Sequence, residues 1–357
     1  MVESRGSDPH GIRETLNAFL IFFKRSSSKA VHTGQEFIIG KVLQLYSDVY
    51  EKAARDQIPY HAFIEWDRSL DFIVLDCITN NLNDAAIRGL WTIENAFEWN
   101  FEHNMPAEDE IWEFRHDKYG KEAAGPPGTT TDQSLQWHYV STELISSIGR
   151  LGTISVKNEN DTVASTCLYC LSIIIDKVIK SECGELQKDR IISWCEYFRK
   201  TIAEAGIDSR RDSGRTYLNS YDGHHFNRYI EERPHYAKTY LNNFAQQLRK
   251  AAGLRILDYM VINEMGFIAR SSIHDVDNSP PHADTVTFIC DLFDELRSII
   301  EENYLQEESV IYRTLFQQVQ GFGNWMAKDN QKNTIVQKKI NSTIANFSAG
   351  LKQLDEK

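Results

Sequence analysis

The sequence has few cysteines, few prolines and no long hydrophobic run. Six cysteines in 357 residues are too sparse for a disulfide framework. Only eight prolines occur, which favours helices over a loop-rich fold. The most apolar stretches, 19–23 and 167–175, are far shorter than the roughly 18 residues that a membrane-spanning helix needs. We therefore expect a protein without a membrane span.

Basic residues are outnumbered by acidic ones. Lys and Arg total 39 against 51 Asp and Glu, which gives a formal net charge of −12. Nucleic acids and anionic lipids are bound through basic surfaces, so we expect neither as a partner. The first residues are polar and mixed in charge, without the basic and then apolar order of a signal peptide. These features predict a cytoplasmic protein.

Familiar catalytic motifs are also missing. The sequence contains no phosphate-binding G-x-x-x-x-G-K-[ST], no H-E-x-x-H and no G-x-S-x-G. Two Glu-x-x-His pairs occur, Glu113 with His116 and Glu232 with His235, and two such pairs serve di-iron sites in helical bundles. However, Pro234 interrupts the second pair and favours a helix start there, while the first pair is expected at an exposed helix end. The sequence thus favours a protein that is not an enzyme and that needs no metal or cofactor.

The sequence does contain helical periodicity along most of its length. Apolar residues recur every three or four positions, and no sustained series of alternating strands appears. The expected fold is all-α, and the expected helices cover 12–25, 33–56, 59–78, 84–101, 135–154, 161–179, 185–205, 235–252, 254–272, 282–303, 308–327 and 332–353. In the first two helices the residues expected to face inward are Ile12, Leu16, Phe19, Leu20 and Phe23, and then Phe37, Val42, Leu43, Leu45 and Val49.

Changes in composition suggest domain boundaries. Residues 117–132 are rich in Gly, Pro and Thr and form the clearest break in the periodicity. We interpret 1–10 as a flexible tail, 11–116 as an N-terminal helical region, 117–132 as a linker loop and 133–357 as a C-terminal helical-repeat region.

One short pattern occurs twice. Asp161-Thr162-Val163 is followed by Cys167, and Asp284-Thr285-Val286 is followed by Cys290 at the same spacing. Each copy follows a helix that contains a glycine, Gly149 or Gly266, which we expect to allow close helix packing. We expect Asp161 and Asp284 to be N-caps of equivalent helices, as Asp84 is of an earlier one.

The cysteines of this pattern are expected to be core residues. Cys167 and Cys170 form a C-x-x-C pair, but the second copy has Phe293 at the position of Cys170. No second C-x-x-C is present, and a structural zinc site needs four ligands. Burial in a helix seam therefore explains these thiols better than metal or redox chemistry.

Helix, short turn and antiparallel helix, repeated several times, resembles the irregular HEAT-like repeats of an α-solenoid. The outline recurs more faintly at 72–93 and at 322–340. A multi-helix bundle with similar hairpins remains the alternative. Solenoid repeats leave an extended face free, so the resemblance implies a scaffold that binds another protein or associates with itself.

The richest polar segment provides a different functional hypothesis. Residues 210–236 gather arginines, histidines and tyrosines that suit a phosphate, a nucleotide or an acidic peptide. This hypothesis describes an enzyme or sensor for a small anionic ligand; the alternative is an exposed loop whose arginines pair with nearby carboxylates. The candidate ligand-binding residues are Arg210, Arg211, Arg215, His224, His225, Arg228 and His235.

Overall fold

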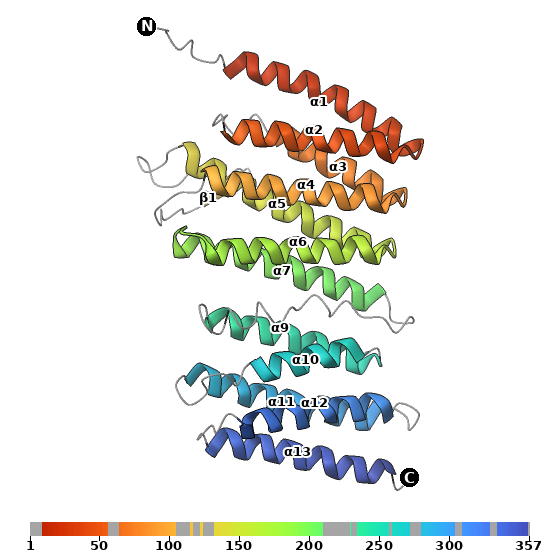
Figure 1. Cartoon of the computed structure of the whole chain (residues 1–357), viewed down its shortest axis with the longest axis vertical. Coiled ribbons are helices and arrows are strands. Elements are labelled where there is room, and N and C mark those ends of the chain that lie inside the picture. The colour runs from red at the N-terminus through yellow and green to blue at the C-terminus, as the bar shows by residue number, and fades with distance from the viewer. Residues whose placement is uncertain are drawn as a thin grey trace. The chain divides into compact units, whose positions relative to one another are not determined.

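The computed structural model describes residues 9–55, 64–104, 115–116, 122–123, 132–209, 229, 234–255, 257, 259–271, 280–303, 309–328 and 334–355. Almost all of them are helical, which confirms the expected all-α fold (Figure 1). The helices are α1 (Pro9–His32), α2 (Glu36–Arg55), α3 (Ile64–Thr79), α4 (Asn83–Asn104), α5 (Asp132–Lys157), α6 (Asp161–Lys180), α7 (Glu185–Ser209), α9 (Pro234–Gly253), α10 (Tyr259–Ser271), α11 (Pro280–Asn303), α12 (Ser309–Lys328) and α13 (Thr334–Asp355).

Two very short strands are also present. β1 (Arg115–His116) pairs with β2 (Glu122–Ala123) in antiparallel fashion, with His116 opposite Glu122. The expectation that His116 stands at a helix end is therefore wrong. Pro234, in contrast, begins α9, as expected of a proline in a first helical turn.

The chain divides into two compact units, 1–202 and 203–357. In the first unit each helix from α1 to α6 packs against its neighbour in sequence and against the next helix but one, so that α1, α3 and α5 form one layer and α2, α4 and α6 another. In Figure 1 the ribbons of this unit run back and forth as antiparallel hairpins. This layered packing of antiparallel hairpins fits an irregular α-solenoid or a multi-helix bundle, as expected.

The second unit repeats the same kind of packing. α9, α11 and α13 contact one another in turn, and α10 packs on α12. α12 also contacts α11 and α13, which joins the two layers. The predicted boundary at 117–132 stays a prediction, because most of that segment lies outside the described residues; α4 and α5, on either side of it, pack together within the first unit.

Three hairpins of the first unit share one turn geometry. Each turn has one residue with positive φ: Gly34 (65°), Asn81 (58°) and Glu159 (57°). The amide of the next residue bonds to the carbonyl five residues before it: Gln35 to Ala30, Leu82 to Cys77 and Asn160 to Ser155. This is the Schellman ending of a helix, in which a left-handed residue satisfies carbonyls that the helix leaves open. The structural repeat of the first unit therefore lies in these turns.

The structure shows that the three aspartates expected to be N-caps lie inside their helices instead. Asn160, and not Asp161, caps α6, because its side chain accepts a bond from the Val163 amide at 3.3 Å. α11 begins at Pro280, which puts Asp284 in the second turn as an exposed residue. Asp84 likewise falls inside the first turn of α4. The Asp-Thr-Val pattern is thus not a duplicated cap.

Two other expectations about this pattern are confirmed. Helices do approach closely at the glycines: a Cβ on Gly149 would lie 2.1 Å from Phe198 of α7, and one on Gly266 would lie 1.9 Å from Gln318 of α12. All six cysteines are free and buried. Burial raises the pKa of Cys290 to about 12 and the pKa of Cys167 well above its ordinary value. Such thiols remain protonated and unreactive at neutral pH.

α6 is the one described helix that is long and apolar enough to cross a membrane by composition. It also supplies core residues: Val163, Leu171 and Ile174 are fully buried, and it packs against α4 and α5. A core helix of a soluble protein passes the same test of length and composition, so this helix gives no clear evidence of a membrane span.

Candidate protein-binding face

The segment predicted to bind a ligand lies almost wholly outside the described residues. Arg210, Arg211, Arg215, His224, His225 and Arg228 are among those outside. His235 is the second residue of α9, and the orientation of its side chain is not described. Tyr229, the one described residue of 210–233, is fully buried and lies edge-on to Tyr240 at 5.9 Å. The ligand hypothesis thus stays a prediction.

A different feature stands out in the first unit, because several large apolar side chains expected to face inward are exposed. Phe37 is 76% exposed and Leu45 is 43% exposed, whereas Val42 and Leu43 are buried as expected. Phe19 of α1 is likewise exposed. The buried stripe of α2 consists of Ile39, Val42, Leu43, Tyr46 and Tyr50.

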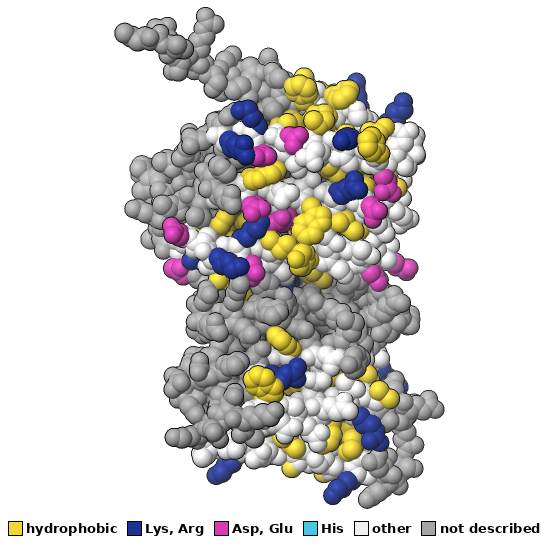
Figure 2. Space-filling view, in the orientation of Figure 1, with side chains coloured by type: hydrophobic (Ala, Val, Ile, Leu, Met, Phe, Trp, Pro, Cys, Tyr) yellow, Lys and Arg dark blue, Asp and Glu magenta, His cyan; other side chains and the backbone are white. Residues whose placement is uncertain are grey.

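The exposed residues of α2 have counterparts on the two other helices of their layer. Tyr169 of α6 is 58% exposed, and Trp91 of α4 is half-buried. Their rings meet edge-on with centroids 5.7 Å apart. Figure 2 shows hydrophobic side chains gathered over α2, α4 and α6 in the view of Figure 1. We call Phe37, Ile38, Leu45, Trp91 and Tyr169 the apolar face.

Contacts along α4 and α6 fix the register of this face. At the start of the two helices Asn160 Nδ2 donates to Asn83 Oδ1. Two turns further on, Trp91 meets Tyr169. Further along, Glu94, about one turn beyond Trp91, pairs with Lys177, about two turns beyond Tyr169, with Nζ 2.9 Å from Oε1. The two helices are therefore parallel and held together at three levels.

α2 joins the same layer in a matching register. The Arg88 guanidinium lies against Gly40, where a Cβ would come within 2.9 Å of Nη1. A Cβ on Gly89 would lie 3.7 Å from Leu43 Cδ2. These contacts place Leu45 at the level of Trp91. Leu45, Trp91 and Tyr169 thus form a row across three neighbouring helices.

An ion-pair cluster supports the end of this row. Glu94 is buried, and Lys177 bridges it to Glu98 with a second contact of 2.6 Å. Burial raises the pKa of Glu94, and the ammonium of Lys177 opposes that rise. The pKa of Lys177 is raised through its bonds to the two carboxylates, which outweigh partial burial. The cluster is a charged clamp between α4 and α6.

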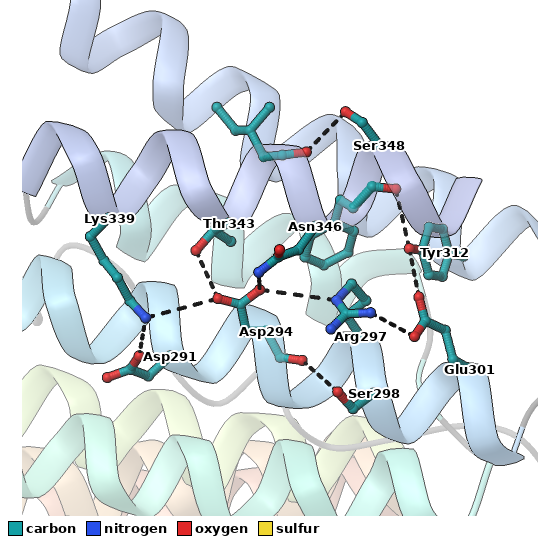
Figure 3. Close-up of polar contacts among 12 residues, drawn as sticks. Asp291, Asp294, Arg297, Ser298, Glu301, Tyr312, Lys339, Thr343, Asn346 and Ser348 are labelled. Atoms are coloured by element: carbon teal, nitrogen blue, oxygen red, sulfur yellow. Dashed lines mark hydrogen bonds and ion pairs between the residues drawn. The ribbon is translucent and has the colours of Figure 1, made fainter. Parts of the chain in front are cut away.

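The second unit carries a larger polar network, which Figure 3 shows between α11 and α13. Asp294 accepts hydrogen bonds from Thr343 and Asn346, both at 2.9 Å. Lys339 lies 2.5 Å from Asp291, and this bond raises the pKa of Lys339. Every carboxylate shown here is engaged by a side chain of the same unit, which is the pattern of a structural contact.

The network continues toward α12. The Tyr312 hydroxyl lies 3.0 Å from Glu301 Oε1 and 3.2 Å from the carbonyl of Phe347. Arg297 pairs with the same Glu301 at 2.6 Å. Burial and the neighbouring carboxylate raise the pKa of Tyr312, so the hydroxyl remains protonated. These bonds fix three helices in place.

The described residues contain no cluster of three or more His, Cys, Asp or Glu side chains with metal-binding geometry. We take the apolar face as the candidate site of the first unit. Trp and Tyr are the residues that most often dominate binding at protein interfaces. What this arrangement offers chemically is apolar contact area on a rigid helical layer.

Comparisons with known proteins place the chain in no family. No family model and no curated protein matches it. Two solved structures are similar at 11% identity. The first is a "circular tandem repeat protein with novel repeat topology and enhanced subunit contact surfaces"; the match covers 96% of this chain and 73% of that chain at a TM-score of 0.35. The second is from "computational design of self-assembling cyclic protein homooligomers"; the match covers 90% of this chain and 99% of that chain at a TM-score of 0.26. At such scores neither carries an argument about function. The helix packing itself defines the class, a repeat-like all-helical protein.

Proposed function

We propose that this protein is a helical scaffold that binds another protein, or a second copy of itself, through the apolar face of α2, α4 and α6. The observation that supports the proposal is the row of Leu45, Trp91 and Tyr169 at one level on three helices, with Leu45 and Tyr169 exposed and Trp91 half-buried between them. Exposed apolar clusters on a soluble surface are characteristic of interaction sites.

The geometry suits recognition more than catalysis. α4 and α6 are tied by the Asn83–Asn160 bond and the Glu94–Lys177 pair, and α2 packs on α4. Together they present a surface that needs no rearrangement to bind. A preorganised surface loses little entropy on association, which favours affinity. Tyr169 and Trp91 contribute large, stiff rings at low conformational cost.

The test replaces the exposed row with charge. Leu45→Glu combined with Tyr169→Glu should abolish the association, since truncating a central interface residue alone costs about 2 kcal/mol or more. Phe72→Glu is the matched control, because Phe72 is an exposed aromatic on α3 in the other layer. Size-exclusion chromatography with light scattering is run on the pure proteins and after incubation with extract of the source cells.

The mass of the complex separates the two kinds of partner. A multiple of the chain mass identifies self-association, and any other increment identifies a different protein. The proposal fails if the parent protein is a monomer that retains no partner, or if Phe72→Glu loses the complex as completely as the double variant does.

A further inference from the structure

The outer face of α1 is basic although the chain as a whole is acidic. From residue 15 to residue 35 the sequence contains no Asp or Glu, while Lys24, Arg25 and Lys29 are basic. α1 packs on α2 and α3 through Leu20 and Phe23 and through its last turns. Figure 1 shows α1 at one edge of the first unit, and Figure 2 shows hydrophobic side chains beside Lys and Arg at that edge.

The exposed side of α1 is divided along its length. Ala18, Ile21 and Phe22 lie in the third and fourth turns of the helix, and Ile21 and Phe22 are 55% and 64% exposed. The following turns expose Arg25, Lys29 and His32 on the same side, at helical spacing from Ala18. Within 18–32, the part of α1 whose side chains are described, an apolar half is thus followed by a basic half.

Helix stability accounts for only part of this pattern. Lys29 and His32 stand in the last turn of α1, where positive charge interacts favourably with the helix dipole. That effect gives no reason for Ile21 and Phe22 to lie in solvent, where apolar area is unfavourable. A binding role explains both halves of the face.

We propose that the outer face of α1 binds an acidic amphipathic helix of a partner protein, independently of the apolar face. Such a helix packs apolar residues on Ile21 and Phe22 and directs carboxylates at Arg25 and Lys29. Helix-in-groove recognition uses this spacing of anchors, and complementary charge sets its orientation.

The charge pattern argues against the other occupants. Two copies of α1 would place basic residues opposite each other in a parallel pair, and basic residues opposite apolar ones in an antiparallel pair. The separation of apolar and basic residues into two halves also suits a helix more than a flat bilayer.

The experiment uses the full chain and a fluorescent helical peptide with leucines over its first half and glutamates over its second. Binding measured by fluorescence anisotropy should be saturable and should weaken as salt rises, because the charged contacts are exposed. The same peptide with lysines in place of glutamates should not bind. Failure of the acidic peptide to bind, or equal binding of both peptides, overturns the proposal.

Charge reversal on α1 provides the decisive comparison. The double variant Arg25→Glu with Lys29→Glu should bind the acidic peptide about tenfold more weakly or worse, and it should bind the lysine peptide. Lys41→Glu with Lys52→Glu, at two exposed positions of α2, is the control with the same change in net charge and should retain acidic-peptide binding. Equal losses in the two variants contradict a site on α1.

The remaining occupants are tested with the same proteins. If light scattering shows a dimer and the charge-reversal variant of α1 is a monomer, the face binds a second copy and the proposal of a partner helix is rejected. Binding to phosphatidylserine vesicles that the α1 reversal abolishes would assign it to a membrane and also reject the proposal. Because the α1 variants leave Leu45 and Tyr169 unchanged, a negative result for α1 does not affect the proposal that the apolar face binds a protein.

Discussion

At the scale of single residues, Asn160 serves two helices at once. Its Oδ1 accepts from the Val163 amide at the start of α6, and its Nδ2 donates to Asn83 in α4. The residue is buried, so both bonds are shielded from water. One side chain therefore caps a helix and fixes the register of the layer that carries the apolar face.

Replacing Asn160 with alanine should reduce the free energy of unfolding by about 1–2 kcal/mol, because the cap and the bond to Asn83 are both lost. Urea unfolding measures the change. Asp284→Ala is the control: Asp284 is exposed in the second turn of α11 and should change stability by less than about 0.5 kcal/mol. Equal losses in the two variants would refute the assignment of the cap.

The cap predicted from the sequence, Asp161, is one residue away from the actual cap, Asn160. Asn158, Glu159, Asn160 and Asp161 are four consecutive polar residues, and each side chain can accept a hydrogen bond. The choice among them is made by the backbone, because the left-handed Glu159 directs Asn160 into the capping position. A positive φ cannot be predicted from the residue type when the residue is neither Gly nor Asn.

At the scale of elements, the Schellman turn is the unit that recurs. Gly34 and Asn81 suit the left-handed conformation, whereas Glu159 and Arg255, at the end of α9, adopt it with a side chain that disfavours it. The sequence at 72–93 predicts a faint copy of the hairpin, and the structure confirms it as α3, turn and α4. The identical hydrogen bonds of the turns were not predictable, since the residues differ.

Replacing Glu159 with glycine should raise the free energy of unfolding by about 0.5–1 kcal/mol, because glycine adopts positive φ without steric cost. Thermal and urea unfolding measure the gain. Lys157→Gly, in the last turn of α5, should instead destabilise by about 1 kcal/mol. A loss of stability in Glu159→Gly would show that the turn does not carry this strain.

The clamp between α4 and α6 predicts a specific pH dependence. Lys177→Met should destabilise the protein by about 3 kcal/mol at pH 7, because Glu94 is left buried as an anion without its cation. The folded-state pKa of Glu94, already raised by burial, then rises further. The folded form binds the proton more tightly than the unfolded form, so stability recovers as pH falls through that raised pKa.

Urea unfolding of Lys177→Met at pH 7 and pH 5 measures this recovery. The double variant Glu94→Gln with Lys177→Met is the control, because it has no carboxylate at position 94 to titrate. An equal loss at both pH values in Lys177→Met would contradict burial of Glu94 as the cause.

At the scale of the whole molecule, the fold class was predictable and the candidate site was not. Periodicity of 3.6 residues is a local property, and it located the helices closely. Exposure depends on which helices meet: Phe37 and Leu45 are apolar residues that we expected to face inward, but the packing of α2 on α4 leaves them in solvent. The exposure of these two residues is therefore set by a contact between helices, which the local sequence pattern does not contain.

The most direct test of the scaffold proposal is photo-crosslinking from the apolar face in the source cells. Benzoylphenylalanine placed at Tyr169 should give a discrete adduct of higher mass on irradiation, whereas the same group at Phe72 in the other layer should give none. The adduct at position 169 should also disappear when Leu45 is replaced by glutamate. Absence of an adduct at position 169, or equal adducts at both positions, would contradict binding through α2, α4 and α6.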